Sequence, residues 1–335
     1  MKIIVTGGCG FIGSNFIHYL LNKYPSVKII NLDLLTYAGN LANLHDIQKD
    51  KRYQFVRGDI RDGKVVNRLM SVSPDAVVNF AAESHVDRSL YNPSAFLNTN
   101  ILGTQVLLEA AIKYKIPRFI QISTDEVYGS LAPNEPAFTE DHPLKASSPY
   151  SASKAAADLL VKAYEKTFGY KAIITRSSNN YGPYQFPEKI IPLFITNALE
   201  NKPLPLYGDG KNIRDWLYVQ DNCEAIALIM EKGKVGEVYN IGGACEKMNI
   251  EITRTILKAL GKPLSLIKFV KDRPGHDRRY ALNISKIKRE LGWQPKYRFE
   301  DGIKKTIRWY QENKEWWRRI KSGEYLKFYR KHYGK

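Results

Sequence analysis

Cysteine is scarce in this 335-residue chain, which carries only Cys9, Cys223 and Cys245. The three lie far apart and form no C-x-x-C pair, so the sequence predicts neither a disulfide framework nor a zinc site. We therefore expect no bound metal. Widely spaced, unpaired cysteines also suit the reducing cytoplasm, which is the compartment that we expect for this protein.

Long apolar runs are also lacking. The stretch 225–230 is among the longest, whereas a membrane-spanning helix needs about 20 apolar residues. The first residues are typical of a core strand rather than of a signal peptide. Repeats and low-complexity segments are absent as well. The sequence therefore predicts a globular protein with no membrane partner.

Acidic residues are outnumbered by basic ones, 34 against 51, which gives a net charge of +17. Such an excess is found in nucleic-acid-binding proteins and also on lysine-rich solvated surfaces. The basic residues are spread along the chain, and no zinc-finger, RNP or basic-zipper pattern accompanies them. We therefore expect no nucleic-acid partner, and a positive cleft that attracts an anionic nucleotide is a better use of the charge.

A glycine-rich turn near the N-terminus is the most informative feature. Residues 2–6 form a β-branched run typical of a buried strand, and residues 14–23 carry apolar side chains at helical spacing. Gly7, Gly10 and Gly13 lie between them. In that context, exposed N–H groups and the helix dipole bind a pyrophosphate. The alternative is a turn that merely joins a strand to a helix.

Asp33 favours a dinucleotide at this turn. It follows a second predicted strand, residues 27–32, and comes twenty residues after Gly13. A carboxylate at this position accepts hydrogen bonds from the ribose hydroxyls and repels a 2′-phosphate. The sequence therefore predicts NAD, rather than NADP, as the cofactor.

The alternation of strands and helices predicts an α/β fold with a Rossmann-type, doubly wound parallel sheet. We expect residues 1–178 to form the NAD-binding domain. Residues 179–335 should form mainly a smaller C-terminal substrate-binding lobe, with some segments returning to the main sheet. A basic, aromatic tail at 309–335 is expected to pack as a terminal helix.

The pattern also places the remaining elements. Further strands of the main sheet are expected at 53–57, 75–80, 118–123 and 172–176, with a long helix at 94–114. In the second half we expect a loop at 179–187, helices at 189–201, 250–260, 284–291 and 301–313, and strands at 204–207, 216–219 and 237–241.

Several strand ends carry candidate ligand contacts, because ligands of parallel sheets bind at the carboxyl ends of strands. Asp59 is placed to bond the adenine amino group and Ile60 to pack on its ring, although Asp59 is equally suited to cap a helix. Ala81 and Ala82 are small enough for a cofactor to lie close. His85 follows them as a candidate substrate contact.

Tyr150 and Lys154 open a predicted helix and, four residues apart, share one of its faces. An ammonium beside a phenol lowers the phenol's pKa because the cation stabilises the phenolate. The phenolate takes a proton from a sugar hydroxyl while a hydride leaves the same carbon for NAD. Thr124, which ends the fifth predicted strand, is expected to hold that oxygen. The alternative is chance, since Y-x-x-x-K is common on helices.

The glycine turn and the Tyr150-x-x-x-Lys154 motif resemble the extended short-chain dehydrogenase/reductase family over essentially the whole chain. Within that family, residues 35–40, 124–126 and 272–277 resemble the dTDP-glucose 4,6-dehydratases. The resemblance implies a lyase that converts dTDP-glucose to dTDP-4-keto-6-deoxyglucose for deoxysugar synthesis. It also implies a homodimer, formed by a helix pair near residues 105–114 and 153–164.

Asp125 and Glu126 discriminate between members of such a family. A 4-epimerase only oxidises and reduces C4, whereas a 4,6-dehydratase must also eliminate water across C5 and C6. The resemblance implies that Glu126 removes the C5 proton and that Asp125 protonates the departing C6 hydroxyl. Opposite duties require separated pKa values. The alternative is that the two acids merely end a strand.

The resemblance assigns further residues to two sets. The expected cofactor contacts are Gly7, Gly10, Phe11, Ile12, Gly13, Asp33, Leu34, Leu35, Thr36, Asn40, Asp59, Ile60, Ala81, Ala82, Ser84, Asn100, Tyr150, Lys154 and Asn180. The expected substrate contacts are His85, Thr124, Asn179, Glu188, Lys189, Ile190, Pro205, Leu206, Tyr207, Arg214, Asn249, Asp272, Arg273, Pro274, Gly275 and His276. Arginine suits a diphosphate because its planar guanidinium pairs with phosphate oxygens.

Two other functions remain open at this point. One is a different nucleotide-sugar enzyme on the same scaffold: a 4-epimerase, a decarboxylase or a dehydratase of another nucleotide sugar. The other is a protein that binds nucleotides or nucleic acid without catalysis. An intact set of Tyr150, Lys154, Asp125 and Glu126 argues against the second, because a binding protein has no use for all four.

Overall fold

The computed structural model describes residues 1–322 and residue 329. In that part of the chain, a seven-stranded sheet has the order β10-β6-β5-β4-β1-β2-β3, and every neighbouring pair is parallel. Its strands are β1 (Lys2–Thr6), β2 (Lys28–Asp33), β3 (Tyr53–Arg57), β4 (Ala76–Asn79), β5 (Phe119–Thr124), β6 (Ile173–Ser177) and β10 (Val238–Ile241). The expected Rossmann-type, doubly wound sheet is confirmed.

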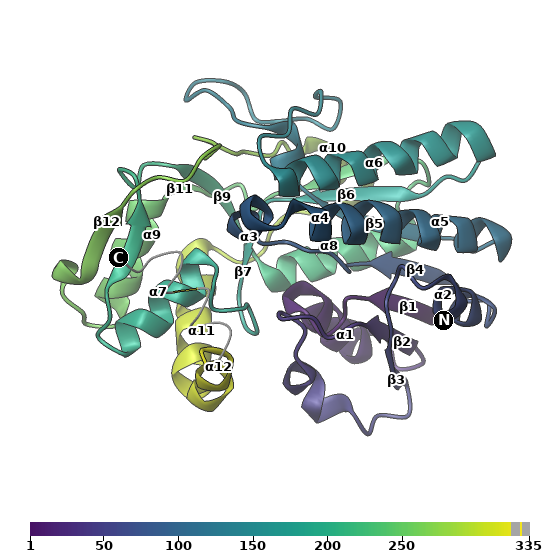
Figure 1. Ribbon diagram of the computed structural model, residues 1–335, viewed down its shortest axis with the longest axis horizontal. Helices are drawn as coiled ribbons and strands as arrows, with labels where there is room; N and C mark the ends of the chain where they lie inside the picture. Colours follow the sequence, from purple (N-terminus) through teal and green to yellow (C-terminus); the bar gives the residue numbers. More distant parts are fainter. Residues whose placement is uncertain (323–328, 330–335) are drawn as a thin grey trace.

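Helices cover both faces of this sheet (Figure 1). Ile3 and Val5 of β1 belong to the same buried cluster as side chains of α1 (Phe11–Lys23), α8 (Val219–Lys232) and α10 (Ser285–Leu291). Ile4 points to the opposite face and belongs to the cluster of α2 (Gly63–Met70), α5 (Gly103–Lys113) and α6 (Pro149–Phe168). Apolar residues on both faces of one strand are what a covered parallel sheet requires.

A smaller lobe is built from the second half of the chain and lies to the left of the main sheet in Figure 1. Two small sheets, β11-β9-β7 and β12-β8, form it together with four helices. The strands are β7 (Asn179–Tyr181), β8 (Leu204–Tyr207), β9 (Ile213–Tyr218), β11 (Glu246–Met248) and β12 (Ile267–Val270). The helices are α7 (Ile190–Leu199), α9 (Asn249–Ala259), α11 (Phe299–Glu312) and α12 (Lys314–Ile320).

Short helical segments complete the described chain. They are α3 (Val86–Tyr91), α4 (Pro93–Phe96), the 3-10 turns η1 (Leu41–Ile47), η3 (Asp125–Tyr128) and η4 (Leu264–Leu266), and the π-helical segment η2 (Leu97–Leu102). The single helix expected at 94–114 is therefore divided into α4, η2 and α5. Among the described residues, no helix has both the length and the apolar character needed to cross a bilayer.

Two predictions for the second half of the chain concern the segment 179–187 and the tail 309–335. The loop expected at 179–187 is wrong at its start, because Asn179 to Tyr181 pair with β9 as strand β7. The tail expected at 309–335 contains α12, whose Trp317 is buried against α11. The rest of that prediction, at 323–328 and 330–335, lies outside the described residues.

Candidate active site

The glycine turn between β1 and α1 is shaped so that only glycine fits at two of its positions. Gly7 has a φ of +68°, and a Cβ there would lie 2.6 Å from the backbone nitrogen of Ala81. A Cβ on Gly13 would lie 2.4 Å from the carbonyl oxygen of Gly7. Gly10 precedes α1 and supplies no side-chain cap. The first N–H groups of the helix are therefore available to an anionic ligand.

Asp33 is held rigidly at the end of β2. One carboxylate oxygen accepts a hydrogen bond from the backbone N–H of Cys9 and the other from that of Leu35, both at 2.8 Å. Burial raises the pKa of Asp33, and the two backbone hydrogen bonds oppose the rise. The carboxylate is thus fixed in position on the wall of a cavity, where it can also accept from a ligand hydroxyl.

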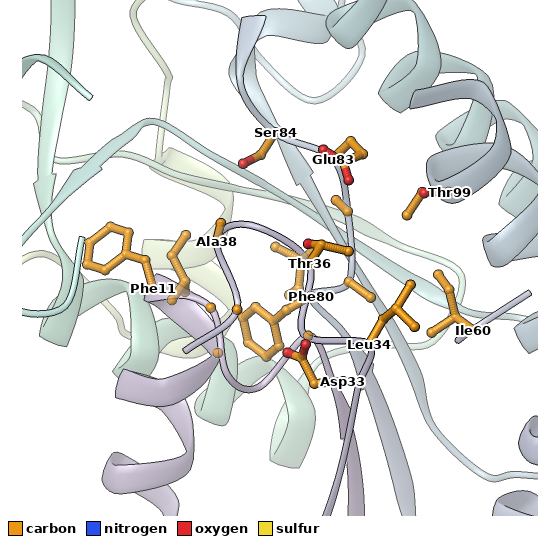
Figure 2. A pocket seen from close by; sticks show the side chains of 18 of the residues that line it. Phe11, Asp33, Leu34, Thr36, Ala38, Ile60, Phe80, Glu83, Ser84 and Thr99 are labelled. Carbon is orange, nitrogen blue, oxygen red and sulfur yellow. The ribbon is translucent and has the colours of Figure 1, made fainter. Parts of the chain in front are cut away.

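This cavity, called the first cavity below, lies at the carboxyl ends of the central strands. Figure 2 shows Asp33, Thr36 and Phe80 on one side of it and Glu83 and Ser84 on the other. Fifteen of the expected cofactor contacts line it: Gly7, Gly10, Phe11, Ile12, Gly13, Asp33, Leu34, Thr36, Asp59, Ile60, Ala81, Ala82, Ser84, Tyr150 and Lys154. An extended cavity with an anion-binding turn and a fixed carboxylate fits a dinucleotide.

Four expected cofactor contacts do not reach the wall of this cavity. Leu35 packs against the core beneath the loop, and the side chain of Asn40 caps η1 by accepting from Ala42. Asn100 instead braces the strand end, since its side chain bonds both backbone groups of Glu83. The side-chain nitrogen of Asn180 turns to the carbonyl oxygen of Ser178.

Tyr150 and Lys154 are placed by a well-defined helix start. Ser148 and Ser151 form a reciprocal capping box, and Pro149 occupies the first turn, so α6 begins at a fixed point. The Lys154 ammonium donates to the carbonyl oxygen of Ile122 at 2.5 Å. Burial lowers the pKa of Lys154 to about 8.

The pKa of Tyr150 differs from the expectation. Burial raises it, the nearby Glu126 carboxylate raises it further, and a hydrogen bond with Thr124 opposes the rise. The expected lowering is wrong for the site as the structure describes it, because desolvation of the phenolate is the largest influence on this pKa and the Lys154 ammonium donates to Ile122 instead.

The two adjacent acids face different surroundings. Asp125 is buried, and Thr124 donates to one of its carboxylate oxygens at 3.1 Å. Within the described residues, the other oxygen has no hydrogen-bond partner. Burial and the Glu126 carboxylate raise the pKa of Asp125 well above its usual value. Asp125 is therefore disposed to stay protonated.

Glu126 lines a second cavity and is surrounded by cations. Burial raises its pKa, but Arg273, Lys189 and Arg214 act in the opposite direction. The two carboxyl groups thus differ in the neighbouring groups that oppose the rise in pKa caused by burial. The Thr124 hydroxyl and Arg214 oppose the rise in the pKa of Asp125, whereas Arg273, Lys189 and Arg214 oppose the rise in that of Glu126.

The second cavity adjoins the first, and Glu188 and Lys189 line both. Twelve expected substrate contacts line the second cavity: His85, Asn179, Glu188, Lys189, Ile190, Pro205, Leu206, Tyr207, Arg214, Asn249, Arg273 and His276. Arg273 pairs with Asp87 at 3.2 Å, while its Nε has no partner among the described residues. An unpaired buried donor of this kind suits a diphosphate oxygen.

Four expected substrate contacts are not on the wall of the second cavity. Thr124 lies beside Tyr150 and Asp125 instead. Asp272 pairs with His276 at 2.6 Å and so orients that ring. Pro274 and Gly275 form the turn between them, and Gly275 adopts a φ of +63°.

Sequence reasoning missed other residues of the walls. In the first cavity they include Ala38, Gly39, Phe80, Glu83, Thr99, Ser123, Gln185 and Phe186, and in the second Val86, Asp87, Leu193, Phe194 and Trp216. Glu83 and Asp87 belong to the strand end that supplies Ser84 and His85, so extending the prediction along that segment would have found them. Phe186 begins the stretch 186–190, which also resembles the dehydratases, whereas nothing in the sequence marks Gln185.

Within the described chain, no group of three or more His, Cys, Asp or Glu side chains is arranged to hold a metal ion. The chemistry of the site therefore depends on the two cavities and on five residues beside them. Tyr150 and Lys154 line the first cavity, Glu126 lines the second, and Thr124 and Asp125 precede Glu126 in the chain.

Comparison with known proteins gives a consistent result. The sequence model of the family described as GDP-mannose 4,6 dehydratase matches residues 4–306. A dTDP-glucose 4,6-dehydratase of Xanthomonas campestris pv. campestris is 51% identical, covering 96% of each chain. The crystal structure of dTDP-glucose 4,6-dehydratase from Bacillus anthracis, in complex with NAD, is 52% identical, with a TM-score of 0.90 over 96% of this chain and 99% of that one. The enzyme of the same name from Streptomyces venezuelae, with NAD bound, is 50% identical, with a TM-score of 0.93 over 96% and 100%.

Proposed function

Because this chain belongs to the dTDP-glucose 4,6-dehydratase family of extended short-chain dehydrogenases/reductases, we propose that it converts dTDP-glucose to dTDP-4-keto-6-deoxyglucose. The observation that carries the proposal is the position of Asp125 and Glu126. Asp125 is buried and Glu126 is half-buried on the wall of the second cavity. Both carboxyl groups raise the pKa of Tyr150, and different sets of charges act on the two. An enzyme that only epimerises C4 has no step for such a pair.

The two cavities divide the ligands between them. NAD occupies the first, with its pyrophosphate at the N-terminus of α1 and its adenosine ribose at Asp33. The nucleotide sugar occupies the second, with its diphosphate near Arg214 and Arg273. Residues 1–178 therefore supply most of the NAD site and the lobe after residue 178 most of the sugar site.

Catalysis begins at Tyr150, which accepts the proton of the C4 hydroxyl. Burial raises the pKa of the Tyr150 hydroxyl, so the phenolate has to form in the loaded site, where the positive charges of Lys154 and of oxidised NAD favour it. When bound, NAD accepts a hydride from C4 and later returns it to C6. Thr124 lies beside Tyr150, and its hydroxyl, which donates to Asp125 in this structure, would turn to the C4 oxygen and hold it in line when the substrate binds. Lys154 stabilises the negative charge that Tyr150 carries.

Elimination then uses the two acids. The C4 carbonyl makes the C5 proton acidic, and Glu126 removes that proton while the C6–oxygen bond breaks. Asp125, kept protonated by burial, gives its proton to the departing hydroxyl, so water leaves. After the hydride reaches C6, the proton returns to C5 and NAD is regenerated. NAD is therefore a bound catalyst rather than a consumed substrate.

The first test is mass spectrometry of dTDP-glucose incubated with the purified protein and NAD. We expect a product lighter by one water. Asp125→Asn and Glu126→Gln should each slow its formation by at least about 100-fold, as loss of a general acid or base does. A product of unchanged mass but inverted C4 would establish a 4-epimerase, and turnover of only another nucleotide sugar would reassign the substrate.

A homodimer is the assembly that we propose. Leu97 and Leu102 of η2 and Leu159 of α6 are 46%, 49% and 61% exposed. The two segments are adjacent, because Asn100 of η2 donates to Ser153 of α6 at 2.8 Å. Exposed leucines on adjacent helices suit a helix-pair interface. A mass from light scattering should be twice that of the chain, and a monomeric mass would refute the dimer.

We also propose a cytoplasmic location. The three cysteines are free, and Cys9 and Cys223 are buried as thiols, as a reducing compartment permits. Recovery of the protein from a membrane fraction of its host would contradict this.

A further inference from the structure

Three side chains from distant parts of the chain meet at the wall between the two cavities. The Tyr37 hydroxyl donates to one carboxylate oxygen of Glu188 at 2.9 Å. The Arg88 Nε donates to the other oxygen at 3.1 Å. The Arg88 guanidinium also lies over the Tyr37 ring, 3.8 Å from its centroid. Each of the three therefore contacts both of the others.

Each member comes from a segment that borders a cavity. Tyr37 belongs to the loop after β2, whose neighbours Thr36, Ala38 and Gly39 line the first cavity. Arg88 is in α3, which begins directly after His85. Glu188 lines both cavities and stands just before α7 of the smaller lobe. The cluster thus ties the loop of the cofactor site to the smaller lobe.

Neighbouring contacts strengthen the same connection. The Phe186 ring packs edge-on against the Tyr37 ring at 5.4 Å. The Lys189 ammonium donates to the carbonyl oxygen of Ser84 at 2.9 Å. The Glu188 side chain is only 4% exposed, so its bonds to Tyr37 and Arg88 form in a setting where charged hydrogen bonds are strong.

We propose that Tyr37, Glu188 and Arg88 form a latch that closes the loop 34–40 over bound NAD and retains the cofactor between turnovers. This inference rests on the proposed function, because it takes the first cavity to be the NAD site. Release of NAD requires the loop to move away from the smaller lobe, and this breaks the bond between Tyr37 and Glu188. The nucleotide sugar uses the second cavity and exchanges without opening the latch.

The latch gives Glu188 a second role. As a substrate contact alone, Glu188 would direct its carboxylate to the sugar cavity, but both of its oxygens are bonded to Tyr37 and Arg88. Retention is what the proposed reaction needs, because the hydride taken from C4 must return to C6 of the same molecule. An enzyme that lost its reduced cofactor midway would release an unfinished intermediate.

The variant Tyr37→Phe tests the latch, because it removes only the hydroxyl and keeps the ring beneath Arg88. A hydrogen bond to a charged acceptor contributes enough to slow dissociation by about 10- to 100-fold. We therefore expect NAD to leave the variant about 10- to 100-fold faster, measured as NAD retained after rapid gel filtration. Turnover without added NAD should fall accordingly, and kcat at saturating NAD should return to the wild-type value.

Tyr170→Phe is the matched control. Its hydroxyl also makes one hydrogen bond, to the carbonyl oxygen of Ile116 at 3.0 Å, but, unlike Tyr37, it has no chain neighbours on the wall of either cavity. This variant should retain NAD as the wild type does. Arg88→Gln removes the contact with the Tyr37 ring and the positive charge, so it should accelerate NAD loss as Tyr37→Phe does. If Tyr37→Phe does not fold, Arg88→Gln serves as the test variant in its place.

The outcomes separate the latch from the proposed function. Wild-type protein that neither retains NAD nor dehydrates dTDP-glucose refutes the function. Wild-type protein that does both, together with a Tyr37→Phe variant that loses NAD no faster than Tyr170→Phe, refutes the latch alone. A Tyr37→Phe variant whose kcat stays low at saturating NAD also overturns it, since the hydroxyl would then act on chemistry rather than on retention.

Discussion

Gly13→Ala is the most direct test of the glycine turn. The added Cβ would lie 2.4 Å from the Gly7 carbonyl oxygen and 2.8 Å from the Gly8 Cα. Both atoms belong to the backbone, so the turn and α1 must separate. Alanine normally favours a helix over glycine by up to about 1 kcal/mol, but forcing an extra carbon into a packed site costs roughly 1–3 kcal/mol. The steric effect therefore wins, and it acts where the pyrophosphate should bind.

Separation of the turn moves the N–H groups that receive the pyrophosphate. If the cost of roughly 1–3 kcal/mol appears in binding, NAD affinity falls by about 5- to 140-fold. Isothermal titration of the protein freed of NAD measures this directly. Gly63→Ala is the control, since its Cβ would have no neighbour closer than 3.9 Å. Equal NAD affinity in the two variants would refute the assignment of the turn.

Three further changes follow from buried groups. Activity should fall as the pH rises through about 8. Burial lowers the pKa of Lys154 to about 8, and above that pH its neutral amine no longer stabilises the Tyr150 phenolate. A pH–rate profile without a basic limb would contradict this. Asp158→Asn should lower the free energy of unfolding by roughly 3–5 kcal/mol. The Asp158 carboxylate pairs with the buried Arg176 guanidinium at 2.9 Å, and the variant removes the negative charge of that pair. Urea denaturation measures the loss, and an unchanged midpoint would refute it. Phe119→Ala in the sheet core should cost roughly 3–5 kcal/mol in the same assay, since its side chain is fully buried; a loss below about 1 kcal/mol would show that the core refills the cavity.

The sheet was predictable because its strands are short apolar runs that end at turn residues. The expected ranges 2–6, 53–57 and 204–207 coincide with β1, β3 and β8. Helix α8 was not predicted, although it is among the best-buried elements. Its polar face, Gln220, Glu224 and Glu231, is interrupted by six consecutive apolar residues, 225–230. The helical spacing of polar residues is therefore hard to recognise in the sequence.

The site was predictable only where function depends on local motifs. The glycine turn and the strand end at Thr124 are continuous segments, and the structure places both at the first cavity or beside it. By contrast, Tyr37 and Glu188 are 151 residues apart in the chain, and no local pattern connects them. The Tyr150 pKa depends on burial, which is a property of the packed molecule rather than of the spacing to Lys154.

Asp125 and Glu126 show how the fold gives two like groups different chemistry. They leave β5 at the start of η3, so one carboxyl turns toward Thr124 and the other into the second cavity. Arg214, Arg273 and Lys189 are the cations that oppose the rise in the pKa of Glu126. On the proposed function, the two arginines also receive the diphosphate. A bound diphosphate partly neutralises them, so it raises the pKa of Glu126 and makes this carboxylate a stronger base when a substrate is present. The same positive charge thus serves both recognition and the timing of C5 deprotonation.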